Sequence, residues 1–143
     1  MLDLYKGTRD DNIWFNAICE DKSLRKFQLF SSEKNIIEIG QVEKHQMAGT
    51  PIKLMYSPDQ KHILISFYDN SLSLFHSQNK SNKLKEYISL YGHSLPITDF
   101  DVSSDSYIVA TVSNDKSLRI WDRDFGNCRK IIGRAHEGGI NQL

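Results

Sequence analysis

Short apolar runs separated by polar turns characterise the C-terminal half of the chain. Each run has five or six residues, is rich in β-branched and aromatic types, and lies next to a turn containing Ser, Asp or Asn. The runs are Ile97–Val102, Ile108–Val112, Leu118–Asp122 and Cys128–Ile132. This pattern predicts four short antiparallel strands.

The same pattern occurs three times along the chain. Asp115–Trp121 aligns with Asp69–Phe75 at an offset of 46 residues, and that segment aligns with Asp21–Phe27 at a further 48. A repeat of this length indicates an array of one small structural unit. The second-strand runs Ile63-Leu64-Ile65 and Ile108-Val109-Ala110 are continuously apolar, which predicts strands covered on both faces by neighbouring sheets.

Two dipeptides in the last complete unit indicate its family. Gly92-His93 lies near the start of the unit and Trp121-Asp122 near its end, with 28 positions between His93 and Trp121. In a unit of about 40 to 45 residues, this arrangement resembles the WD repeat. The resemblance implies an all-β fold: a WD-repeat β-propeller fragment with about three four-stranded antiparallel blades in an open arc.

The repeats predict the boundaries of the blades. Blade 1 is expected at about residues 1–44, blade 2 at about 49–90 and blade 3 at about 91–132, and the next blade begins in 135–143. We expect blade 1 to be incomplete, because only residues 1–9 remain for its first strand and Gly7-Thr8 interrupts them. Its other strands are expected at Ile13–Ile18, Leu24–Phe30 and Ile36–Val42.

Four polar side chains of blade 3 can form a hydrogen-bonded chain. An indole N–H only donates, an imidazole donates and accepts, and a carboxylate only accepts. His93, Thr111, Asp115 and Trp121 resemble the structural tetrad of WD-repeat proteins, which implies a structural role. The alternative is a hydrolase triad of histidine, aspartate and a hydroxyl. We favour the structural interpretation, because the repeat explains every member without catalysis, and we assign no catalytic residue.

The other two blades carry only part of this set. Phe27 and Phe75 stand where blade 3 has Trp121, and Ile65 replaces the hydroxyl of Thr111. His45 could stand in for His93 in blade 2, but the spacing would need two extra loop residues. We therefore interpret His45 as a loop histidine.

Composition narrows the classes of function. The 143 residues contain 18 Lys and Arg and 18 Asp and Glu, so the net charge of +0 gives no general attraction to nucleic acid or membranes. Cys19 and Cys128 are too few for a disulfide framework or a zinc cluster. No run approaches the ~18 apolar residues of a membrane span, and the first residues lack a signal-peptide pattern. These features predict a soluble intracellular protein without metal, cofactor or membrane contact.

Two segments of blade 3 carry a narrower resemblance. Leu90-Tyr91-Gly92-His93 with Leu95-Pro96, and Asp124-Phe125-Gly126-Asn127-Cys128, resemble the later blades of the large WD-repeat component of the U-three small nucleolar ribonucleoprotein, in the small-subunit processome. The sequence departs from that family at Asp122, where glycine is more common, and at Gly133-Arg134, where an aromatic residue is usual.

That resemblance implies a non-enzymatic protein-interaction scaffold in the nucleolus, active in pre-ribosomal RNA processing and ribosome biogenesis. Its partners would be other proteins of a large assembly, with pre-ribosomal RNA contacted indirectly through the complex. The alternative is a WD-repeat module that recognises peptides or substrates in a signalling or ubiquitin-ligase complex. Candidate protein-interaction residues at the loop end are Tyr68, Ser94 and Asn114. Because three blades leave two faces uncovered, the isolated segment is expected to self-associate.

Asp124-Phe125-Gly126 also matches the metal-binding triplet of protein kinases. The other kinase motifs are missing from the sequence, so we interpret the triplet as a turn between the third and fourth strands. In that turn Gly126 tolerates positive φ, and Phe125 is expected to pack on the outer strand.

Overall fold

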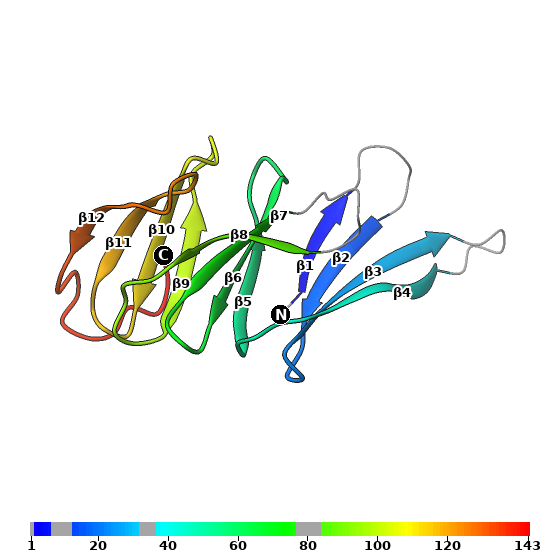
Figure 1. The fold of residues 1–143 in the computed structure, drawn as a ribbon, viewed down its shortest axis with the longest axis horizontal. Helices are drawn as coiled ribbons and strands as arrows, with labels where there is room; N and C mark the ends of the chain where they lie inside the picture. The colour runs from blue at the N-terminus through cyan, green and yellow to red at the C-terminus, as the bar shows by residue number, and fades with distance from the viewer. Residues whose placement is uncertain (1, 7–12, 32–36, 77–83) are drawn as a thin grey trace.

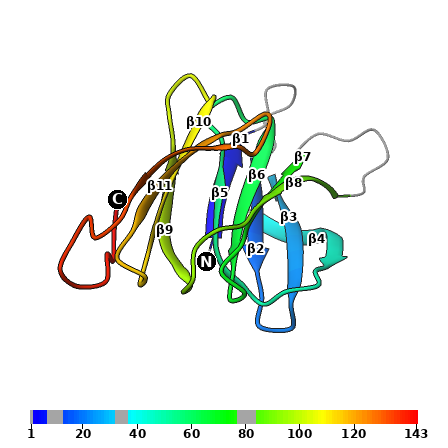
Figure 2. The same ribbon diagram turned by 60° about the vertical axis from the view of Figure 1, so that its left-hand side comes forward.

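The computed structural model describes residues 2–6, 13–31, 37–76 and 84–143. In these residues, twelve strands form three antiparallel sheets of four strands each, and the strands of a sheet lie side by side in chain order. The three sheets follow one another from right to left in Figure 1, and Figure 2 shows them turned by 60°. The predicted all-β fold of three four-stranded units is confirmed.

The first sheet contains β1 (Leu2–Lys6), β2 (Ile13–Ile18), β3 (Ser23–Ser31) and β4 (Ile37–Gln46). The second contains β5 (Pro51–Tyr56), β6 (His62–Phe67), β7 (Leu72–His76) and β8 (Lys85–Leu90). The third contains β9 (Ile97–Val102), β10 (Ile108–Ser113), β11 (Leu118–Asp122) and β12 (Cys128–Ile132).

The expectation of an incomplete first unit is wrong. All five residues of β1 pair with β2, from Leu2 opposite Ala17 to Lys6 opposite Ile13. Five residues are enough for an ordinary strand, so the segment before Gly7 can complete the sheet. The boundaries of the three blades in the chain stay a prediction.

One turn recurs between the second and third strands of every sheet. An aspartate Oδ1 accepts hydrogen bonds from the backbone N–H and the hydroxyl of the serine two residues later, in the pairs Asp21–Ser23, Asp69–Ser71 and Asp115–Ser117. These bonds hold the middle residue at positive φ, which is rare outside glycine. The φ angles are 59° at Lys22, 70° at Asn70 and 69° at Lys116.

A register shift marks a second equivalent position. In each sheet the pairing of the third and fourth strands shifts just before the aromatic residue of the third strand, namely Phe27, Phe75 and Trp121. A bulge of this kind bends the strand locally. The three aromatic residues are therefore structurally equivalent, as the repeat alignment predicts.

The apolar core lies between the sheets. Between the second and third sheets, Leu64, Leu74 and Leu90 share a cluster with Phe100, Val109 and Trp121. Between the first and second sheets, Leu24 and Met47 pack with Ile63, Ile65, Phe67 and Phe75. Every residue of β6 is buried, so the prediction of a strand covered on both faces is confirmed there. It does not hold for β10, where Ile108 and Ala110 are partly exposed.

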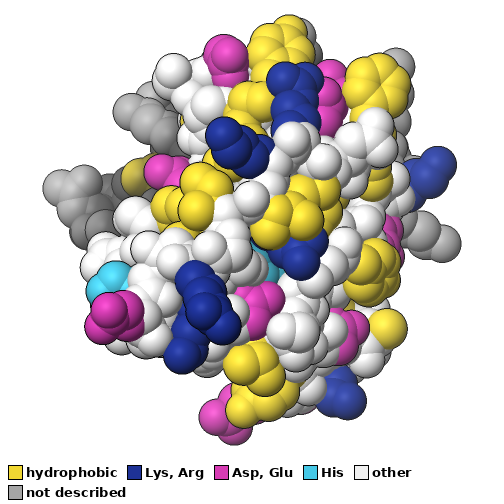
Figure 3. All heavy atoms as spheres, turned by 90° about the vertical axis from the view of Figure 1, so that its left-hand side faces the viewer, with side chains coloured by type: hydrophobic (Ala, Val, Ile, Leu, Met, Phe, Trp, Pro, Cys, Tyr) yellow, Lys and Arg dark blue, Asp and Glu magenta, His cyan; other side chains and the backbone are white. Residues whose placement is uncertain are grey.

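The outward surface of the third sheet carries mixed side chains. Figure 3 looks at this end of the molecule and shows apolar side chains dispersed among charged and polar ones. All five residues of β12 are exposed, including Ile131 at 54% and Ile132 at 42%.

The residues after β12 form no strand, although 135–143 were expected to begin another blade. They nevertheless contact the first two strands of the third sheet. The Ile140 N–H donates to the Ser113 carbonyl at 3.4 Å, and the Leu143 N–H donates to Asp99 Oδ2 at 2.9 Å. No helix in the described part of the chain is long and apolar enough to cross a membrane.

Candidate functional site

The four tetrad residues come together in the third sheet. His93 lies in the loop before β9, Thr111 in β10, Asp115 in the turn after β10, and Trp121 in β11. The Trp121 indole Nε1–H donates to Thr111 Oγ1 at 2.8 Å, and Thr111 Oγ1 lies 2.8 Å from His93 Nε2. His93 Nδ1 lies 2.9 Å from Asp115 Oδ2. The structure thus links two strands, a loop and a turn through one hydrogen-bonded chain.

The directions of these hydrogen bonds determine the tautomer and the charge of the His93 imidazole. Because the indole can only donate, Thr111 Oγ1 accepts from it and directs its own proton to His93 Nε2. His93 Nδ1 then carries the proton that Asp115 accepts, so the neutral ring satisfies both neighbours. A second proton on Nε2 would oppose the Thr111 hydroxyl proton. Burial lowers the pKa of His93 below its ordinary value, although Asp115 acts in the opposite direction.

Asp115 holds more than the histidine. Its Oδ2 also accepts from the Ser94 backbone N–H at 3.0 Å, and its Oδ1 accepts from the Ser117 hydroxyl at 2.6 Å. Burial alone would raise the pKa of Asp115, but the hydrogen bonds from Ser117, His93 and the backbone outweigh burial and hold the pKa well below its ordinary value. The carboxylate therefore fastens the loop before β9 to the turn after β10.

Sequence reasoning missed Ser117 as a member of this network. Its hydroxyl lies 3.1 Å from His93 Nδ1 and is buried. The signal was present in the sequence, because all three repeats have Asp-X-Ser at this turn.

The tetrad is closed to substrates. The side chain of His93 has no exposed surface and Thr111 is 0% exposed. The Thr111 hydroxyl is also committed to Trp121 and His93, so it is poorly placed to act as a nucleophile. This geometry favours the structural interpretation of the tetrad over the hydrolase triad.

The kinase-like triplet forms a turn. Gly126 has a φ of 68°, and the backbone N–H groups of Asp124 and Phe125 donate to Asp122 Oδ1 at 3.0 and 3.1 Å. Phe125 is 75% exposed, so the expectation that it packs on the outer strand is wrong. Among the described residues, no group of three or more His, Cys, Asp or Glu side chains could hold a metal ion.

The candidate interaction residues Tyr68, Ser94 and Asn114 are all exposed. Tyr68 follows β6 and Asn114 follows β10 at the equivalent place, and their N–H groups donate to the carbonyls of Thr50 and Pro96. Ser94 is tied to the tetrad through Asp115. The three residues therefore occupy the loop end of the second and third sheets, where a partner could reach them.

His45 is not the loop residue that we expected. It lies within β4 opposite Leu24, because β4 extends four residues beyond the expected Val42. Its Nε2 lies 3.1 Å from Glu43 Oε2, and its Nδ1 accepts from the Leu84 N–H at 3.4 Å. The second sheet's counterparts of the tetrad are Ile65, Asp69 and Phe75. His45 is not hydrogen-bonded to Asp69, and the side chains of Ile65 and Phe75 have no donor or acceptor.

Polar contacts also join successive sheets. The Arg123 guanidinium donates to Asp59 Oδ2, in the turn between β5 and β6, and to Asp124 Oδ1, both at 2.9 Å. Lys53 of β5 is paired with Asp99 of β9. Asn16 of β2 donates to the Tyr56 hydroxyl of β5 at 2.5 Å. Each pair of neighbouring sheets is thus fixed by polar contacts in addition to apolar packing.

Comparison with known proteins agrees with the fold. Residues 84–122 match the WD40 family, described as "WD domain, G-beta repeat". A WD repeat-containing protein 55 homolog of Drosophila erecta is 27% identical over 112 residues, which cover 73% of this chain and 22% of that protein. The homolog of Drosophila melanogaster is 26% identical over the same length.

A 77 kDa echinoderm microtubule-associated protein of Lytechinus variegatus is 28% identical over 80 residues, or 56% of this chain and 12% of that protein. The chain spans about a fifth of the length of the Drosophila relatives. The matched residues run from β8 of the second sheet through β11 of the third, so the sequence repeat bridges two sheets. The chain therefore contains a WD40 repeat, built around the hydrogen-bonded tetrad of its third sheet.

Proposed function

We propose that this chain is a segment of a non-enzymatic protein-interaction scaffold in the small-subunit processome, where it contributes to pre-ribosomal RNA processing in the nucleolus. The proposal rests on two segments of the third repeat, Leu90-Tyr91-Gly92-His93 and Asp124–Cys128. Both segments lie in one blade, and their sequences and spacing resemble those of the processome WD-repeat family.

The exposure of these segments supports a role in binding. Tyr91 is 69% exposed and Phe125 is 75% exposed, whereas His93 in the same motif is buried. The fold explains His93 through the tetrad, but it gives the two aromatic side chains little packing. Exposed aromatic residues are common anchors of protein interfaces. The motif therefore combines a structural centre with side chains that a partner can bury.

The relatives support the WD-repeat architecture. The proposed role in pre-ribosomal RNA processing rests on the two sequence segments and not on the relatives. Their names refer to WD repeats in one case and to microtubule association in the other. WD repeats present loops and edges on a rigid scaffold, which suits docking of other proteins. Contact with pre-ribosomal RNA would be indirect, in keeping with the net charge of +0.

The test is affinity purification of the full-length parent protein. We expect processome proteins and small-subunit precursor RNA to copurify, the proteins to remain bound after ribonuclease treatment, and the tagged parent to localise to the nucleolus. The double variant Tyr91→Ala/Phe125→Ala should lose these proteins. Ile39→Ala is the matched control, because Ile39 is 62% exposed on β4 and lies outside the motif. Recovery of a ligase adaptor or signalling protein in place of processome proteins would contradict the proposal.

A further inference from the structure

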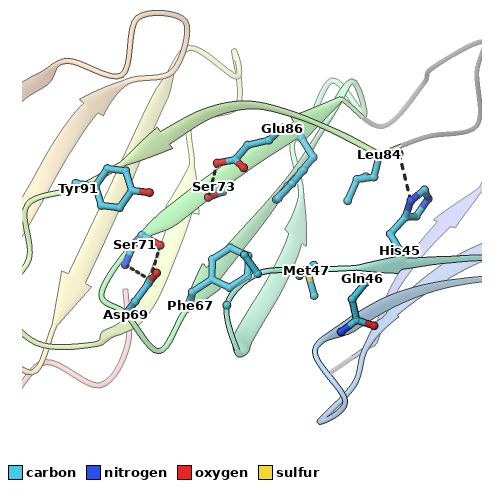
Figure 4. Close-up of a pocket in the computed structure, with 13 residues that line it drawn as sticks. His45, Gln46, Met47, Phe67, Asp69, Ser71, Ser73, Leu84, Glu86 and Tyr91 are labelled. Atoms are coloured by element: carbon cyan, nitrogen blue, oxygen red, sulfur yellow. Dashed lines mark hydrogen bonds between the residues drawn. The ribbon is translucent and has the colours of Figure 1, made fainter.

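An open pocket of about 330 Å³ lies along the second sheet, between β4 and the outer strand β8. Figure 4 shows the Glu86–Ser73 and Asp69–Ser71 pairs along the stretch between Tyr91 and Met47. Phe67 and Phe75 also line it. The pocket thus combines two carboxylates with aromatic surface, and none of the described residues that line it is Lys or Arg.

One residue that lines the pocket, Ser73, is small where the other two repeats have a long side chain. Ser73 pairs with Ile65 in the second sheet, as Arg119 pairs with Thr111 in the third and Arg25 with Ala17 in the first. The three positions are therefore equivalent. Two of the three sheets carry an arginine where the second sheet has a serine.

The arginines of the neighbouring sheets show which contacts this position offers. In the first sheet, Arg25 Nη2 donates to Asp21 Oδ2 at 2.7 Å. In the third sheet, the Arg119 guanidinium lies 5.9 Å from the centre of the Trp121 ring. A Cβ added at Gly92 would lie 2.5 Å from Arg119 Nη1, so the guanidinium fills the space beside that glycine.

The second sheet keeps the groups that these arginines contact. Asp69 is the counterpart of Asp21, and Phe75 is the counterpart of Trp121. Gln46, the counterpart of Gly92, does not fill the space, because its Nε2 donates to the carbonyls of Asp21 and Lys22 at 2.8 and 3.2 Å. The pocket thus contains the carboxylate and the aromatic ring that an arginine contacts in the other sheets, but no arginine among the residues that the structure describes occupies it.

The two carboxylates are oriented by serine hydroxyls. Asp69 Oδ1 accepts from the Ser71 hydroxyl at 2.5 Å, whereas Oδ2 has no hydrogen-bond partner within the residues that the structure describes. Glu86 Oε1 accepts from Ser73 at 3.2 Å and from Ser89. Both carboxylates lack a cationic partner in the described part of the chain.

We infer that this pocket binds an arginine side chain of a partner polypeptide. A guanidinium can donate in its plane to a carboxylate and stack its face on an aromatic ring, which an ammonium group does less well. The inference deepens the proposed function by naming the side chain that a partner inserts, and it rests on that function only in requiring a protein partner.

The test is an NMR titration of the ¹⁵N-labelled 143-residue chain with N-acetyl-L-arginine amide. We expect saturable shifts of the amides of Asp69, Ser71, Ser73 and Glu86, weaker binding of the lysine analogue, and no saturable binding of the neutral citrulline analogue. Asp69→Asn keeps the Oδ1 acceptor of the turn and should weaken arginine binding about tenfold. Asp105→Asn is its control, because Asp105 Oδ1 also accepts from a serine hydroxyl and a backbone N–H in a turn, and Asp105 does not line the pocket.

Ser73→Arg supplies the decisive variant. It gives the second sheet the residue found in the first and third sheets, so it should fill the pocket and abolish binding while the chain stays folded. Ser104→Arg places the same charge on an exposed turn and should bind like the wild type. Equal shifts in wild type and Ser73→Arg, equal binding of citrulline and arginine, or shifts spread over unrelated acidic residues would overturn the inference. Because the probe is a single amino-acid derivative, failure here is distinguishable from failure to recover processome proteins.

Discussion

Met47 occupies in the second sheet the position that His93 occupies in the third. Each residue lies four positions before the first strand of its sheet, Pro51 in one case and Ile97 in the other. Met47 is 8% exposed and packs in an apolar cluster with Ile65 and Phe75, whereas His93 bonds to Thr111 and Asp115. One repeat is therefore held at this place by apolar packing and the other by a polar chain.

Thr111→Val should destabilise the chain by about 1 to 3 kcal/mol, because it leaves the Trp121 indole N–H and His93 Nε2 buried without their shared partner. The free energy of unfolding from urea denaturation measures the effect. The matched control is Thr50→Val, which makes the same change at an exposed position. Equal stability of the two variants would show that the tetrad contributes nothing to the fold.

Met47→His alone should destabilise the second sheet by about 1 to 3 kcal/mol, because the imidazole would be buried beside Ile65 and Phe75 with no partner for Nε2. The triple variant Met47→His/Ile65→Thr/Phe75→Trp supplies the missing hydroxyl and indole. Its free energy of unfolding should exceed the value obtained by adding the changes measured for the three single variants to the wild-type free energy. Strictly additive effects would contradict the equivalence of the two positions.

The tetrad should make stability depend on pH in two ranges. The folded pKa values of His93 and Asp115 both lie below their ordinary values of about 6.5 and 3.9, so each group contributes stability above its unfolded pKa and loses it as the pH falls. The Asp115→Asn variant loses the acidic contribution, and the pKa of His93 falls further in it because the Asp115 charge no longer raises that pKa. The difference in unfolding free energy between wild type and variant should be constant near neutrality and shrink below about pH 4. A difference that grows in acid would have the wrong sign for this account.

Arg123→Ala should loosen the junction of the second and third sheets. The guanidinium is 9% exposed, bonds to Asp59 and Asp124, and lies 5.4 Å from the centre of the Tyr107 ring. We expect a loss of about 1 to 3 kcal/mol in urea denaturation. Arg129→Ala is the control: its side chain is 55% exposed and paired with Asp122, so its loss should be about 0 to 1 kcal/mol.

The 143-residue chain should self-associate as its concentration rises. The edge strand β12 is exposed at all five residues, and an unpaired edge can pair with a second copy. Static light scattering measures the average mass. Ile131→Lys places a charge on this edge and should reduce association, whereas an unchanged monomer mass at high concentration would refute the prediction.

Much of this structure follows from local sequence signals. Strand β2 and the strands of the second and third sheets follow from apolar runs between turns. The donor and acceptor types of His93, Thr111, Asp115 and Trp121 allow a hydrogen-bonded chain, and the resemblance to WD-repeat proteins is what implied their grouping as a tetrad. Residues such as His45 were harder to place, because a strand can extend through polar positions when its partner strand continues, as β3 does opposite β4. The first strand was not predicted because Gly7-Thr8 was expected to interrupt it. The five residues before Gly7 are nevertheless enough to pair with β2.

Other features depend on what a residue lacks. Met47 carries no polar signal, so only its position before β5 shows that it replaces a histidine. Ser73 carries no special signal in the sequence. Only the strand register shows that it stands where the other two sheets have Arg25 and Arg119. Exposure is likewise set by three-dimensional context, which is why the packing of Phe125 was wrongly expected.

The central claim is that the tetrad is a buried structural network that holds the WD40 repeat together. Hydrogen exchange of the Trp121 indole N–H, followed by NMR at neutral pH, tests it most directly. The account predicts that this proton exchanges only when the chain unfolds globally, and that Thr111→Val accelerates exchange by the factor expected from its loss of unfolding free energy. Exchange as rapid as that of an unprotected indole, in a chain that remains folded, would contradict it.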